Sequence, residues 1–185
     1  SRMGTKLSPN IVNLRPGDDD WLKIRPGTEL VGTVATANEE IVHVAVFTTA
    51  IGTEYRLRWR LTGVDYYSGG TWVTLSGPAL ALSEYSIIST TSWNDKLDFA
   101  DGATGVYEID FDTFSYALIA AAPICRQITT FAGRLVASYI TELGVVYPAR
   151  IKWSEKNDNT DWTSQGSGEE DLLNTPGGIV DTQLG

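Results

Sequence analysis

Apolar and polar residues alternate with a period of two along much of the chain, which is the spacing of half-buried β-strands. The clearest run lies at residues 55–61, where aromatic and aliphatic side chains alternate with Arg56, Arg58 and Arg60. Residues 71–75 and 105–111 follow the same rule. The sequence therefore predicts an all-β fold with very little helix.

One segment could compete as a short helix. Residues 115–122 are largely apolar, but Tyr116 and Ile119 favour a strand and Pro123 would end a helix. We therefore expect a strand here as well.

The predicted strands fall into three sets of similar length. The first strands of the sets begin near residues 41, 85 and 127, with spacings of 44 and 42 residues, within the roughly 40 to 50 residues of a propeller blade. The expected strands are 41–50, 54–61, 71–75, 85–90, 96–100, 105–111, 127–131, 134–140 and 149–154.

This periodicity predicts a β-propeller-like array of small antiparallel sheets. We expect an N-terminal arm and entrance segment at 1–38, then about three blades at 39–82, 83–124 and 125–185. A β-sandwich with meandering strands is the alternative, because three imperfect repeats are a weak periodicity.

Short turns within the sets support the blade interpretation. Gly69–Gly70, Asp101–Gly102 and Ala132–Gly133 are typical of tight hairpins. Three blades cannot close a ring, since propellers have about 4 to 8. Either the N-terminal segment helps to build another blade, or the chain is part of a larger propeller, or neighbouring chains complete the surface. Residues 179–185 read like the start of a further strand, which favours a part of a larger propeller.

Composition narrows the possible chemistry. The 185 residues carry a net charge of -9, with one histidine, His43, and one cysteine, Cys125, and both are expected to be packed residues. A single cysteine excludes an intramolecular disulfide, and the acidic balance disfavours nucleic-acid wrapping. No stretch approaches about 18 consecutive apolar residues, and the polar N-terminus lacks a signal-peptide core, so we expect no membrane contact.

Several motifs occur in a recognisable order. They are the segment RPGTELVG from Arg25, the runs 131–138 and 147–154, the turn 158–162, and the pair 169–173 and 176–180. Together they resemble tail-associated β-propeller proteins of tailed bacteriophages. The resemblance covers most of the chain, although from about residue 56 to 93 it rests on strand pattern more than on motif.

This resemblance implies a structural virion protein rather than an enzyme, placed in the tail as a nozzle or hub component and assembled in the host cytoplasm. It implies no cofactor or metal. The expected partners are other tail or neck proteins and copies of the chain itself. DNA would only pass by, because an acidic channel wall repels phosphate and lets DNA slide.

The motif residues also have local physical roles. Arg25, Pro26 and Gly27 predict a rigid turn, since proline fixes φ and glycine accepts positive φ. Trp153 shares a strand face with apolar residues and should face a core. Asp161 belongs to a polar turn of Asx hydrogen bonds that Trp162 should close by packing back on the sheet.

The row of Arg56, Arg58 and Arg60 is the one basic concentration in the sequence. Its functional interpretation is a docking face for an acidic neighbouring subunit. Its alternative is a solvated strand face paired with carboxylates of the next strand.

Other carboxylates offer weaker candidates. Asp95, Asp98 and Asp101, or the turn 158–161, could bind Ca²⁺, but neither has EF-hand spacing and solvated turns are favoured. Glu108 and Asp110 could form a glycosidase pair, although such i,i+2 carboxylates are ordinary on an outer strand face. A carbohydrate-binding or receptor-binding tail domain, in which Trp72 or Trp93 would contribute to glycan binding, is the alternative function.

Overall fold

The computed structural model describes residues 14–16, 22–24 and 39–172, and every regular element in these ranges is a β-strand. The strands are β1 (Leu14–Pro16), β2 (Leu22–Ile24), β3 (Ile41–Thr48), β4 (Glu54–Arg60), β5 (Val64–Ser68), β6 (Thr71–Thr74), β7 (Ser89–Trp93), β8 (Lys96–Ala100), β9 (Val106–Asp110), β10 (Ser115–Leu118), β11 (Ile124–Phe131), β12 (Arg134–Glu142), β13 (Val145–Trp153) and β14 (Gly168–Asp171).

The chain divides into two compact units, Ser1–Val31 and Gly32–Gly185. In the first unit, β1 and β2 pair antiparallel. The predicted turn at Arg25, Pro26 and Gly27 lies outside the described residues.

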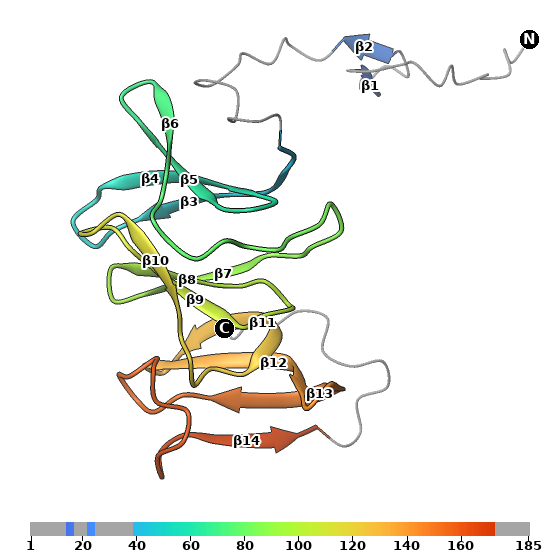
Figure 1. Ribbon diagram of the computed structural model, residues 1–185, viewed down its shortest axis with the longest axis vertical. Helices are drawn as coiled ribbons and strands as arrows, with labels where there is room; N and C mark the ends of the chain where they lie inside the picture. Colours follow the sequence, from blue (N-terminus) through green and yellow to red (C-terminus); the bar gives the residue numbers. More distant parts are fainter. Residues whose placement is uncertain (1–13, 17–21, 25–38, 173–185) are drawn as a thin grey trace, which may run out of the picture. The chain divides into compact units, whose positions relative to one another are not determined.

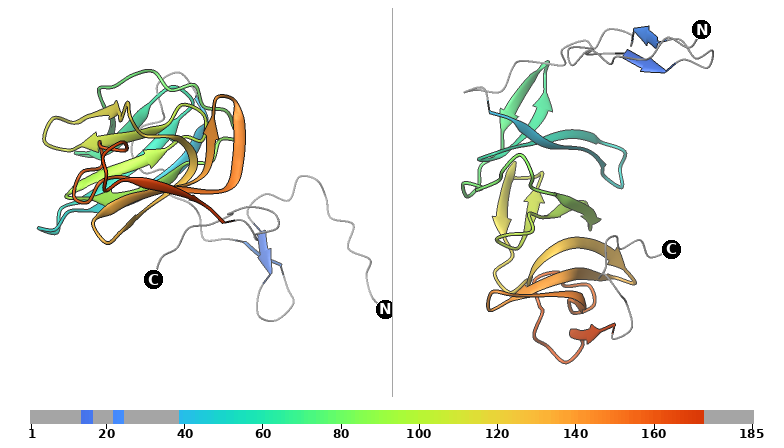
Figure 2. Two further views of the ribbon diagram at one scale, coloured as in Figure 1. Left: turned by 90° about the horizontal axis from the view of Figure 1, so that it is seen from below. Right: turned by 90° about the vertical axis from the view of Figure 1, so that its right-hand side faces the viewer.

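The second unit contains three sheets, each an antiparallel meander of four strands in chain order (Figure 1). We call them the first sheet (β3–β4–β5–β6), the second sheet (β7–β8–β9–β10) and the third sheet (β11–β12–β13–β14). Figure 2 shows the three sheets stacked in sequence. This arrangement confirms the all-β prediction and the array of small antiparallel sheets, and it is consistent with a propeller-like or a sandwich fold.

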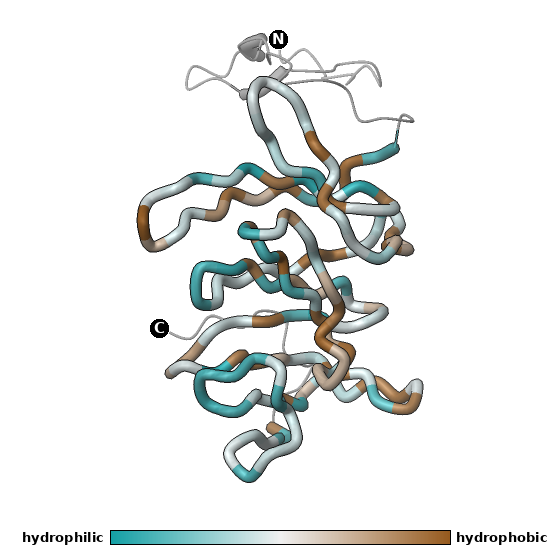
Figure 3. Tube along the Cα trace, turned by 60° about the vertical axis from the view of Figure 1, so that its left-hand side comes forward, coloured by the Kyte–Doolittle hydropathy of each residue, from teal (hydrophilic) through white to brown (hydrophobic). Residues whose placement is uncertain are grey.

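Residue alternation explains why the strands pair as they do. In β4, Leu57 and Trp59 are buried toward the second sheet, while Arg58 and Arg60 lie on the opposite face. Figure 3 shows hydrophobic and hydrophilic residues alternating along strands of this kind. The β5–β6 hairpin turns at Gly69 and Gly70, whose φ values of 56° and 88° suit the two central positions of a tight hairpin turn.

Two separate cores hold the stack together. The core between the first and second sheets is rich in aromatic rings, such as the T-shaped pair Trp59 and Phe99, with centroids 5.5 Å apart. The core between the second and third sheets contains smaller, aliphatic side chains, such as those of Ala100, Val106 and Leu135. Successive sheets are therefore joined by face-to-face apolar packing.

The structure corrects three details of the strand prediction. Residues 64–68 and 168–171 form β5 and β14, which the sequence did not predict as strands. The strand expected at 85–90 occurs instead at 89–93, where Thr90 and Thr91 pair with Phe99 and Asp98. Residues 115–118 form a strand, as predicted for the start of segment 115–122.

Candidate functional site

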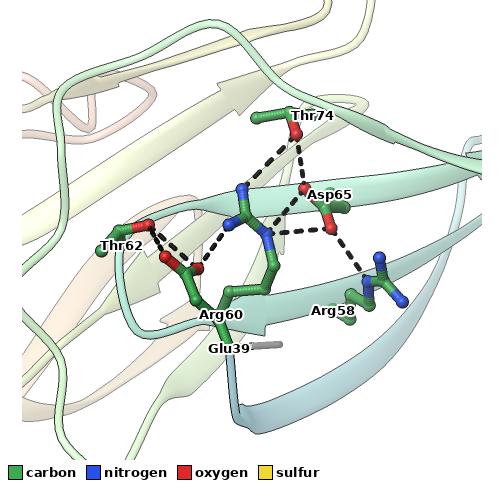
Figure 4. Close-up of polar contacts among 6 residues, drawn as sticks. All are labelled: Glu39, Arg58, Arg60, Thr62, Asp65 and Thr74. Carbon is green, nitrogen blue, oxygen red and sulfur yellow. Dashed lines mark hydrogen bonds and ion pairs between the residues drawn. The ribbon is translucent and has the colours of Figure 1, made fainter. Parts of the chain in front are cut away.

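The predicted arginine row lies on the first sheet, and two of its members, Arg58 and Arg60, contact one buried carboxylate. Asp65 of β5 pairs in register with Arg58 of β4. Its Oδ2 accepts from Arg58 Nε at 2.9 Å and from Arg60 Nε at 3.0 Å, and its Oδ1 accepts from Thr74 Oγ1 at 2.8 Å. Figure 4 shows this carboxylate between the two guanidinium groups, so one carboxylate serves two arginines.

A second carboxylate completes this cluster. Glu39 forms an ion pair with Arg60 through Nη1 and accepts from Thr62 Oγ1 at 2.8 Å (Figure 4). Burial on its own would lower the pKa of Arg60, but the nearby Asp65 and Glu39 raise it above its usual value. The cluster therefore keeps Arg60 charged at the end of β4, an inner strand of the first sheet.

This geometry changes the interpretation of the arginine row. Arg58 and Arg60 expose only 8% and 9% of their surface, so in the single chain they offer little to a docking partner. Arg56 is exposed and pairs with Glu54 at 2.9 Å. Of the predicted contact residues, Arg56 alone presents its guanidinium to the surface.

The outer face of the first sheet also carries exposed aliphatic residues beside the arginines. Val44 and Val46 of β3 lie beside Arg58 and Arg56 in the register, and they are 66% and 63% exposed. Together with Trp72 they line a shallow hollow of about 270 Å³. We call Val44, Val46, Arg56 and Trp72 the Val44 face.

The turn after β13 reaches across to the second sheet. Asn159 is buried, and its side-chain amide donates to Asp98 Oδ2 at 3.0 Å and to Glu108 Oε2 at 2.9 Å. Asp98 is fully buried and its Oδ1 has no hydrogen-bond partner. Burial raises the pKa of Asp98 to about 7, against the opposing effect of the Asn159 hydrogen bond.

The same turn contains two of the residues singled out in the sequence. Asp161 Oδ1 accepts from the backbone amides of Thr163 and Ser164, both at 3.0 Å, which is an Asx-type turn. Trp162 packs against the second core and donates from Nε1 to the Asn159 carbonyl at 2.8 Å. Trp153 is half-buried with its ring over Gly168 of β14.

The three aspartates considered for Ca²⁺ face different surroundings. Asp95 accepts from the Ala50 amide, Asp98 faces the third sheet, and Asp101 Oδ1 accepts from three backbone amides of its own turn. Within residues 39–172, no three His, Cys, Asp or Glu side chains are grouped as metal ligands. These carboxylates therefore have separate roles.

The remaining candidate groups are also engaged in the fold. Glu108 and Asp110 both pair with Lys96, at 2.6 and 3.6 Å. His43 forms a T-shaped contact with Trp59, and burial lowers its pKa. Cys125 is buried, which raises the pKa of its thiol. The described part of the chain contains no helix that is long and apolar enough to cross a bilayer.

Two residues are central to these clusters. Asp65 was not singled out in the sequence, and Asn159 was predicted only as a member of the polar turn at 158–162. Asp65 stands opposite an arginine-rich strand, and that charge pattern is a signal that could have indicated it. Asn159 lies 61 residues from its partner Asp98, so no local pattern indicates the contact.

Comparison with known proteins leaves the geometry as the guide to function. No model of a known protein family matches the sequence, and no curated protein matches it.

Proposed function

We propose that the chain is a structural component of a tailed-phage virion, placed in the tail as a nozzle or hub part that assembles with other virion proteins and with copies of itself. The observation that carries this proposal is the Val44 face. It places two exposed valines beside Arg56 on the outer face of the first sheet, whose opposite face is packed against the second sheet.

Two properties of this face favour assembly. Val44 and Val46 place aliphatic surface in water next to a charged arginine, Arg56, which is the composition of a protein contact more than of a solvated face. In addition, β3 is an end strand of its sheet, so one of its edges has no pairing strand among the described elements. An open edge beside an apolar face invites a neighbouring chain.

The engagement of polar groups within the fold also supports an assembly role. The acidic clusters and the arginines around Asp65 serve ion pairs and turns, which stabilise the stack. With a net charge of -9, a channel wall made of such chains would repel DNA and let it pass. The proposal therefore includes passage of DNA without specific binding.

The proposal is tested by placing charge on the Val44 face. The double variant Val44→Glu/Val46→Glu should fold, because both side chains are exposed, yet it should fail to enter phage particles when supplied in place of the wild-type chain. The matched control is Ile51→Glu/Leu143→Glu, which adds the same charge at two exposed hairpin tips. Normal incorporation of the Val44/Val46 variant would contradict the proposal.

A specific observation favours the alternative function, a carbohydrate-binding or receptor-binding tail domain. It is a hollow beside Arg126, away from the Val44 face.

A further inference from the structure

A hollow of about 340 Å³ lies between the second and third sheets. One wall is the segment before β7, and a second is the β8–β9 turn with Asp101. The third sheet supplies the floor through β11, β12 and the start of β13. The residues that the argument uses are Tyr85, Ile87, Asp101, Arg126, Tyr139 and Val146.

Arg126 differs from the other arginines of the second unit. Arg56, Arg58, Arg60, Arg134 and Arg150 each have a carboxylate within 4 Å, whereas no carboxylate pairs with Arg126 among the described residues. Its guanidinium instead lies over the Tyr139 ring, 5.2 Å from the centroid. A guanidinium that is stacked on an aromatic ring keeps the N–H groups in its own plane free to donate to a bidentate acceptor.

Tyr139, whose ring contacts Arg126, has a strained backbone conformation. Tyr139 has φ 57° in the middle of β12, at a register shift between Ser138 and Ile140. A bulky residue in the left-handed region costs roughly 1–3 kcal/mol, and such costs concentrate at functional sites. Arg126 of β11 stands opposite this position, between the pairs Cys125↔Ile140 and Gln127↔Ser138.

The rim and the opposite wall complete the hollow. Tyr85 is 83% exposed, and Ile87 and Val146 are also exposed, so part of the rim is apolar, next to the serines at 83 and 86. Asp101 Oδ1 accepts three backbone amides of its own turn, at 2.9, 2.7 and 3.1 Å. These bonds fix the carboxylate and leave Oδ2 as an acceptor without a hydrogen-bond donor among the described residues.

We infer that this hollow binds a carboxylate-bearing sugar residue of an acidic polysaccharide. The sugar carboxylate pairs with Arg126, one face of the pyranose ring lies on Tyr85, and a hydroxyl donates to Asp101 Oδ2. A sugar fits better than an Asp or Glu side chain of a peptide, because a uronic or sialic acid brings both a carboxylate for Arg126 and a hydroxyl that can donate to Asp101 Oδ2. This inference does not depend on placement in a phage tail, so either can fail alone.

The test is titration calorimetry of the full chain with oligosaccharides that contain glucuronic, galacturonic or sialic acid. Each is compared with its carboxyl-reduced counterpart of the same length. We expect at least one acidic oligosaccharide to bind with a dissociation constant of about 1 mM or below, and the reduced form to bind at least about tenfold more weakly.

Variants assign the binding to the hollow. Arg126→Ala should weaken binding at least about tenfold, and Tyr85→Ala should weaken it as well. Arg56→Ala is the matched control, since it removes an exposed arginine from another sheet. Three results would overturn the inference: no acidic oligosaccharide binds, Arg126→Ala binds like the wild type, or an acidic peptide binds more tightly at the same residues.

Discussion

Asn159, in the turn after β13, donates its side-chain amide to the buried carboxylate of Asp98 in β8 at 3.0 Å. The two residues belong to different sheets, so this hydrogen bond fastens the third sheet to the second. The same amide also reaches Glu108 in β9. The second interface therefore combines an apolar core with a polar link, whereas the first core is dominated by aromatic rings.

Removal of the link should destabilise the second unit. Asn159→Ala leaves the Asp98 carboxylate buried without its donor, and we expect a loss of about 1–3 kcal/mol in the free energy of unfolding. Urea denaturation at pH 8 measures it. Gln165→Ala removes a side-chain amide from an exposed position in the same connection and should change little. Equal stability of the two variants would contradict the link.

The raised pKa of Asp98 predicts a pH dependence of defined sign. Between the ordinary aspartate pKa of 3.8 and about 7, the folded chain keeps a proton that the unfolded chain has lost. Its contribution to stability therefore falls as pH rises through this window. The free energy of unfolding of Asp98→Asn, relative to that of the wild type, should therefore rise by about 2 kcal/mol from pH 5 to pH 8, because the amide cannot ionise.

Asp110 provides the opposite case on a neighbouring strand. Backbone hydrogen bonds from Asp112 and Thr113 and the nearby Lys96 lower its pKa. Its contribution is present above the unfolded pKa and is lost as pH falls through the folded value. Asp110→Asn should therefore lower stability near neutral pH and approach the wild type in acid. If the stability of the Asp98 and Asp110 variants, each relative to the wild type, changed with pH in the same direction, the predicted opposition of the two carboxylates would be wrong.

The alternation of residues was enough to predict β4, because Leu57 and Trp59 strictly alternate with Arg58 and Arg60. It did not predict β5 or β14. The sequence of β5 places Asp65 among strand-forming residues, and its role appears only when the arginines of β4 pair with it. The sequence of β14, Gly168–Asp171, is polar and lacks a strand pattern.

The candidate sites were less predictable than the strands. The sequence predicted one row of arginines at residues 56, 58 and 60. Their burial differs because Arg58 and Arg60 form ion pairs with the buried Asp65, whereas Arg56 does not. The contacts of Asn159 and the hollow at Arg126 depend on how one sheet stacks on the next. Such contacts join residues far apart in the sequence, so local patterns do not reveal them.

The shared carboxylate in the first sheet should be essential to its stability. Asp65→Asn leaves Arg58 and Arg60 buried with one counter-ion fewer, and we expect a loss of about 3–5 kcal/mol. Glu54→Gln breaks the exposed pair with Arg56 and should cost less than about 1 kcal/mol. Thermal denaturation of both variants compares them. A small loss for Asp65→Asn would mean that the arginines reach solvent.

The connection after β6 is fitted closely to Tyr116. A Cβ at Gly77 would overlap the ring of Tyr116, which is buried and donates its hydroxyl to the Pro78 carbonyl at 2.6 Å. Gly77→Ala should therefore cost about 1–3 kcal/mol by overpacking. In a Tyr116→Leu background the same change should cost clearly less, since the ring is gone. Equal costs in both backgrounds, measured by urea denaturation, would rule out this close approach.

The most direct test of the proposed function is the location of the chain in phage particles. Particles of the tailed phage to which we propose to assign the chain can be purified and imaged by cryo-electron microscopy, with the three stacked sheets fitted to the map. We predict density for these sheets in the tail, with a neighbouring subunit against the Val44 face. Absence of the chain from purified particles would contradict the account.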